Sequence, residues 1–87
     1  MSVQTITNNK AVVNVFPNPS KGLLNITGIN KANTVAYMLD LSGRVVAELR
    51  LDNRAQQTMQ VQVPSGIYFI KIKHDNELIY QEKIVIQ

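Results

Sequence analysis

Side chains able to do chemistry are few in this sequence and lie far apart. His74 is the only histidine, and it lies beside Asp75 in a segment that reads as a hairpin tip, where a solvated surface position is expected. There is no cysteine, which excludes disulfides, thiolate metal ligands and a thiol nucleophile. Ser20, Ser42 and Ser65 each lie in a turn pattern, where a serine hydroxyl is expected to bond to the backbone.

The charged residues form neither a catalytic nor a nucleic-acid-binding pattern. The six carboxylates are scattered without a spacing typical of a general acid and base, and the four glycines form no phosphate-binding loop. The nine basic residues are spread from Lys10 to Lys83 without a basic run, so the net charge of +3 does not indicate nucleic-acid binding. The sequence therefore predicts a protein that is not an enzyme and has no cofactor or metal ion.

Length and hydropathy indicate one small globular domain. The chain has 87 residues, of which 45% are hydrophobic and 17% charged. No apolar run approaches the roughly 20 residues of a membrane span. The start of the chain lacks the basic and apolar regions of a secretory signal, which leaves a cytoplasmic protein or the last piece of a longer precursor.

Apolar and polar residues alternate along most of the chain, as in half-buried β-strands. The alternating segments are 13–15, 24–26, 34–39, 44–51, 58–63, 68–73 and 83–87, and a turn signal lies in every gap. This pattern predicts an all-β protein, an antiparallel sandwich of about seven strands spanning residues 12–87. The polar residues 1–11 are expected to be a linker. The residues predicted to point inward are Val13, Val15, Leu24, Ile26, Val35, Tyr37, Leu39, Val45, Leu49, Val61, Ile70, Ile72 and Ile84.

The stretch VFPNPSKG predicts a tight turn between the first two strands. Pro17 ends the first strand because it has no backbone N–H. Pro19 suits the second position of a type I turn over residues 18–21. Gly22 would then take the left-handed conformation that closes a three-residue hairpin loop with a bulge.

A second turn, DLSG, is expected to use a side chain in place of proline. Asp40 can bond back to the turn amides, and Gly43 can take the left-handed position. The terminal run KIVI (83–86) is apolar on both faces. It is either sandwiched in the fold or presented as an edge for strand addition to a partner.

Four stretches resemble one known family when they are taken together. They are FPNPSKGLLNI, YMLDLSGRVV, VPSGIYFIKI and the terminal EKIVIQ, in that order. They resemble the C-terminal sorting domain of the type IX secretion system of the Bacteroidetes, over about residues 13 to 87. Phe16 stands where that family often has tyrosine, and Arg44 stands where lysine is common.

The resemblance implies an immunoglobulin-like β-sandwich that serves as a removable sorting signal on a larger secreted protein. The cargo would lie on its N-terminal side. The type IX translocon, with its outer-membrane shuttle and sortase proteins, would recognise the domain in the periplasm, move the cargo to the cell surface and remove the domain. An immunoglobulin-like module that binds carbohydrate or protein, as an accessory to a secreted enzyme or adhesin, is the alternative. Aromatic residues make up only 6% of the chain, which weighs against a sugar-stacking platform.

Partner recognition is expected at the first, second and last of these motifs. Arg44 is a candidate because its charge serves no turn, and weak self-association through an edge strand is a further expectation. The candidate recognition residues are Lys83, Ile84, Val85, Ile86, Arg44, Pro17, Asn18, Pro19 and Gly22, while Asp40, Gly43, Gly66 and Tyr68 are expected to be structural.

Overall fold

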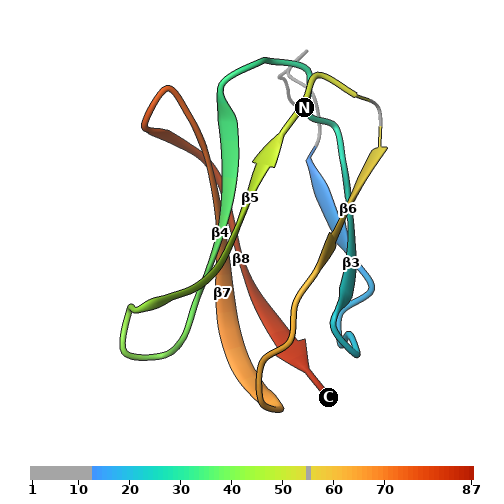
Figure 1. Ribbon diagram of the computed structural model, residues 1–87, viewed down its shortest axis with the longest axis vertical. Helices are drawn as coiled ribbons and strands as arrows, with labels where there is room; N and C mark the ends of the chain where they lie inside the picture. Colours follow the sequence, from blue (N-terminus) through green and yellow to red (C-terminus); the bar gives the residue numbers. More distant parts are fainter. Residues whose placement is uncertain (1–12, 55) are drawn as a thin grey trace, which may run out of the picture.

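The computed structural model describes residues 13–54 and 56–87, and these form two antiparallel sheets that face each other (Figure 1). The three-stranded sheet has the order β2 (Asn14–Phe16), β3 (Leu23–Thr27), β6 (Gln56–Gln60). The four-stranded sheet has the order β5 (Val45–Leu51), β4 (Thr34–Leu39), β7 (Gly66–His74), β8 (Glu77–Ile86). Within these residues, no helix is long and apolar enough to cross a membrane.

The predicted fold class is confirmed: the described residues form an all-β sandwich of seven strands. Relative to the constant-type immunoglobulin order, the fourth strand, β5, pairs at the edge of the second sheet instead of the first. The leading segment 1–11 lies outside the described residues. The boundary expected between residues 11 and 12 therefore stays a prediction.

The core lies between the sheets and is made mainly of aliphatic side chains. Its buried members are Val15, Leu24, Ile26, Ile29, Ala36, Met38, Leu51, Met59, Val61, Tyr68, Ile70, Ile72, Ile84 and Ile86. Seven of the predicted inward residues are among them: Val15, Leu24, Ile26, Val61, Ile70, Ile72 and Ile84. Of the others, Val13 and Leu49 are half-buried and pack against the core, whereas Val45 is exposed.

The predicted orientation of β4 was wrong. Ala36 and Met38 are buried, whereas Val35, Tyr37 and Leu39 lie half-buried on the outer face. Ala36 pairs with Ile72 and Met38 with Ile70, and cross-strand partners point to the same side of a sheet. The register with β7 therefore decides which face of β4 is inside, and the alternation within β4 could not, because both of its faces are apolar.

Strand β8 is longer than the predicted segment 83–87, and it forms a hairpin with β7. Pairing runs from Gly66 with Ile86 to His74 with Glu77. Asp75 and Asn76 form the two-residue turn with φ of 49° and 68°, as a type I′ turn requires. A bulge opposite Ile72 and Lys73 interrupts the alternation that would have signalled the strand earlier. His74 ends β7 instead of lying at the solvated tip, and its side chain is only 23% exposed.

Candidate functional site

The loop between β2 and β3, residues 17–22, reaches across to the four-stranded sheet. The Ser20 N–H donates to the Val85 carbonyl at 2.8 Å, and the Gln87 N–H donates to the Ser20 carbonyl at 2.7 Å. Ser20 thereby forms a parallel bridge with Ile86 at the free edge of β8. The predicted three-residue hairpin turn was wrong, since Pro17 and Pro19 have no N–H to pair with β3 and the loop bonds to β8 instead.

The Asn18 side chain extends this contact along β8. Its Nδ2 donates to the Lys83 carbonyl at 2.9 Å, and its Oδ1 accepts from the Val85 N–H at 3.0 Å. An amide that donates and accepts in this way substitutes for one peptide group of an added strand. We call the contact of Asn18 and Ser20 with Lys83, Val85 and Gln87 the clasp.

The clasp is anchored in the three-stranded sheet as well. Ser20 is buried, its Oγ donates to the Leu23 carbonyl at 2.8 Å, and the Gly22 N–H donates to that Oγ at 3.0 Å. Gly22 has the predicted positive φ, 118°, and its carbonyl accepts from Val61 at 2.8 Å. A Cβ on Gly22 would lie 2.8 Å from the Val61 carbonyl oxygen, so both the backbone angle and the space exclude a side chain.

The second turn is built as the sequence predicted. Oδ1 of Asp40 accepts from the Ser42 hydroxyl at 2.6 Å, the Ser42 N–H at 2.9 Å and the Arg44 N–H at 3.0 Å. The Ser42 hydroxyl and then the Arg44 amide lower the pKa of Asp40 below its ordinary value. Gly43 has a φ of 90°. The Arg44 guanidinium lies 3.2 Å from Oδ2 of Asp40, so the expectation that its charge serves no turn was wrong, although its side chain is 78% exposed.

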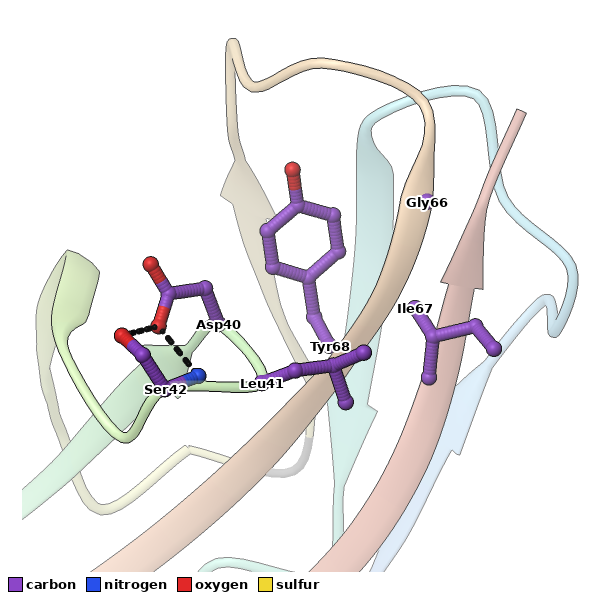
Figure 2. Close-up of a pocket in the computed structure, with 6 residues that line it drawn as sticks. All are labelled: Asp40, Leu41, Ser42, Gly66, Ile67 and Tyr68. Carbon is purple, nitrogen blue, oxygen red and sulfur yellow. Dashed lines mark hydrogen bonds between the residues drawn. The ribbon is translucent and has the colours of Figure 1, made fainter.

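This turn lies beside the start of β7 and forms a shallow groove with it (Figure 2). Tyr68 is buried, and its hydroxyl donates to the Pro64 carbonyl at 2.6 Å. Leu41 is 68% exposed and Ile67 43% exposed. The groove has a volume of about 370 Å³ and is lined by Asp40, Leu41, Ser42, Gly66, Ile67 and Tyr68.

Four segments that are dispersed in the sequence thus meet at one end of the molecule. Ile86 pairs with Gly66 on one side and with Ser20 on the other, and the turn at residues 40–43 adjoins Gly66. Within the terminal run, Ile84 and Ile86 are core residues, whereas Lys83 is exposed and Val85 half-buried on the opposite face.

Sequence reasoning named the main residues of these four segments but did not show that they meet. It missed the exposed Leu41 and Ile67, and it did not assign Ser20 to the edge of β8. An apolar leucine in the middle of a polar turn was the one signal that pointed to the groove.

A comparison with protein families matches residues 14–87 to the secretion system C-terminal sorting domain. The chain belongs to this family. The match covers every strand from β2 to β8 and all four motifs. A comparison with curated proteins gives no match.

Members of this family are C-terminal sorting signals for type IX secretion, and the family is not a catalytic one. Such a sorting domain implies a cargo portion on its N-terminal side and a secretion machinery. It directs export toward the cell surface or the extracellular space. The match does not favour the alternative of a carbohydrate- or protein-binding accessory module.

Proposed function

We propose that this sorting signal is read in its folded form, at the end of the sandwich where the four motifs meet. The supporting observation is that the motifs touch one another only through tertiary pairing, with Ile86 between Gly66 and Ser20. An unfolded chain would present the same sequences apart. In this proposal the domain catalyses nothing. The type IX translocon and its shuttle protein recognise it in the periplasm, and a sortase removes it at the cell surface.

The motif residues fall into two groups, those that stabilise the fold and those that are exposed to solvent. Asn18 and Gly22 are needed to build the clasp and its anchor. Pro17 and Pro19 are exposed, and so are Lys83 and Arg44. We propose that partner contact goes through these exposed groups, while Asn18 and Gly22 act by holding them in place.

The test is export of a passenger protein that carries a signal peptide and is fused to the full 87-residue chain, in a host with type IX machinery. We expect the fusion at the cell surface. Ile70→Asp leaves all four contact residues of the proposal intact but puts a carboxylate at a fully buried core position, so the fold and the export should both be lost.

Thr58→Asp, at an exposed position of β6, is the matched control and should be exported normally. Surface delivery of an unfolded Ile70→Asp fusion would contradict recognition of the folded form. A folded wild-type fusion that stays in the periplasm would contradict the sorting function itself.

A further inference from the structure

The outer faces of the two sheets differ in chemistry. The three-stranded sheet shows solvent mainly uncharged polar residues, such as Asn25 opposite Thr58 and Thr27 opposite Gln56, and its exposed apolar side chains, Phe16 and Leu23, lie only next to the 17–22 loop. A polar outer face is typical of an antiparallel sheet packed on one side only. The four-stranded sheet departs from this pattern.

The outer face of the four-stranded sheet has apolar rows at the motif end and basic side chains beside them. Val45, Leu39 and Phe69 are cross-strand neighbours, and Ile67 with Val85 forms the next row toward the motif end. Val45 is 48% and Ile67 43% exposed. None of the described residues outside this sheet forms a strand over this face, since the other sheet packs on the opposite side.

Basic side chains on three strands lie beside these apolar rows. Arg50 lies on β5, Lys71 and Lys73 on β7, and Lys83 on β8, while Glu48 is the acidic residue of this face. Lys83 stands in the row of Phe69, and Lys71, Lys73 and Arg50 stand in the next two rows away from the motif end. Apolar side chains bordered by charged ones are typical of protein–protein interfaces.

We infer that this face docks a partner protein whose surface presents carboxylates beside an apolar patch. A second copy of this chain is a poor occupant, because two such faces would set their lysines against each other. The groove beside Leu41 and Ile67 adjoins the face and suits an apolar side chain of the partner. The inference rests on the proposed function in one respect: the partner is a component of the export machinery.

The terminal run, residues 83–86, also presents side chains on the outer face of the four-stranded sheet. The clasp occupies the backbone edge of β8 at Lys83, Val85 and Gln87, so a partner strand could add there only by displacing residues 18–20. The side chains of Lys83 and Val85 remain available, and both point onto the outer face, opposite the buried Ile84 and Ile86.

The test combines charge reversal with site-specific photo-crosslinking in the passenger fusion. Lys71→Glu with Lys73→Glu should lower surface delivery at least tenfold, and Arg50→Glu should lower it severalfold. The matched control, Lys31→Glu with Arg54→Glu, changes the charge equally at exposed loop positions outside the motifs and should leave delivery unchanged. Melting curves of the purified chains check that each variant is folded.

A benzophenone side chain at position 67 should crosslink to one protein, identified by mass spectrometry, that has an acidic surface. This product should disappear in the Lys71→Glu, Lys73→Glu background and persist in the control background. The same probe at Thr58 should give no such product. Crosslinks from position 58 but not 67, crosslinks to lipid or to a second copy, or normal delivery of folded Lys71→Glu, Lys73→Glu and Arg50→Glu fusions would each overturn the inference.

The two proposals fail separately in this design. A wild-type fusion that is not exported, but that gives the charge-dependent crosslink at position 67, overturns export by this chain and leaves the docking face standing. A fusion that is exported but does not give that crosslink overturns the docking face and leaves export by this chain standing.

Discussion

Replacing Asn18 tests whether a single side chain closes the edge of β8. Asn18→Ala removes three hydrogen bonds: one to the Lys83 carbonyl at 2.9 Å, one from the Val85 N–H at 3.0 Å and a longer one to the Glu82 carboxylate at 3.4 Å. Each is worth about 0.5–1.5 kcal/mol net. Because Asn18 is exposed, water replaces part of this loss, so we expect a cost of about 1–2 kcal/mol. In a domain of this size, that lowers the melting temperature by roughly 5–15 °C.

Asn18→Asp separates the donor from the acceptor. The aspartate keeps the oxygen that accepts from Val85, but it places a second oxygen against the Lys83 carbonyl where Nδ2 had donated. It also brings a negative charge to the site where Nδ2 lies 3.4 Å from Glu82. We therefore expect Asn18→Asp to be at least as destabilising as Asn18→Ala near neutral pH.

Denaturant unfolding gives the stabilities, and amide hydrogen exchange locates the effect. The Val85 amide should exchange faster in Asn18→Ala, which loses its acceptor, than in Asn18→Asp, which keeps it, whereas the Gln87 amide should change less because its acceptor is the Ser20 backbone carbonyl. Asn30→Ala, at an exposed loop asparagine, is the control and should change neither quantity. An Asn18→Ala chain as stable as the wild type, with Val85 still protected, would refute the clasp.

Three further changes test other parts of the structure. Gly22→Ala should cost about 2 kcal/mol or more, measured by denaturant unfolding, because of its positive φ and the clash with the Val61 carbonyl. Burial and the hydrogen bond to Glu82 raise the pKa of Tyr80 to about 12 from 10.0, so stability should fall as the pH rises from about 10 to 12. Tyr80→Phe should flatten that fall, and an unchanged slope would contradict the assignment. Lys83→Ala should change stability by less than about 0.5 kcal/mol and yet lower surface delivery of the fusion, and normal export would remove Lys83 from the recognition surface.

Local sequence patterns correctly predicted the features that depend on residues close together in the chain. Alternation in β7 gave Ile70 and Ile72 as core residues, and Asp40 with Gly43 gave the turn that the structure contains. The predicted orientation of β4 was wrong because this strand, which contains Val35, is apolar on both faces. Only its pairing with β7 could decide which face is buried.

The clasp was beyond local reasoning for a different reason. Asn18 and Val85 are 67 residues apart in sequence, and neither carries a pattern that points to the other. Of the two prolines, Pro17 was correctly predicted to end the first strand, whereas the hairpin turn predicted around Pro19 was wrong. Their further consequence, that the loop bonds to another sheet, depends on where β8 ends in the folded chain.

The clasp also determines which groups at the end of the chain a partner can contact. An open strand edge offers unpaired N–H and C=O groups to any extended chain, which makes it unselective and prone to aggregation. Here Asn18 and Ser20 satisfy those groups over residues 83–87, so the backbone of the run is already paired within the domain. What the run still offers a partner is the Lys83 charge and the Val85 side chain on the outer face. On this geometry the signal is selective because the backbone of the terminal run is already hydrogen-bonded within the fold. Opening the clasp should therefore raise non-specific association before it affects the side chains that we propose are recognised.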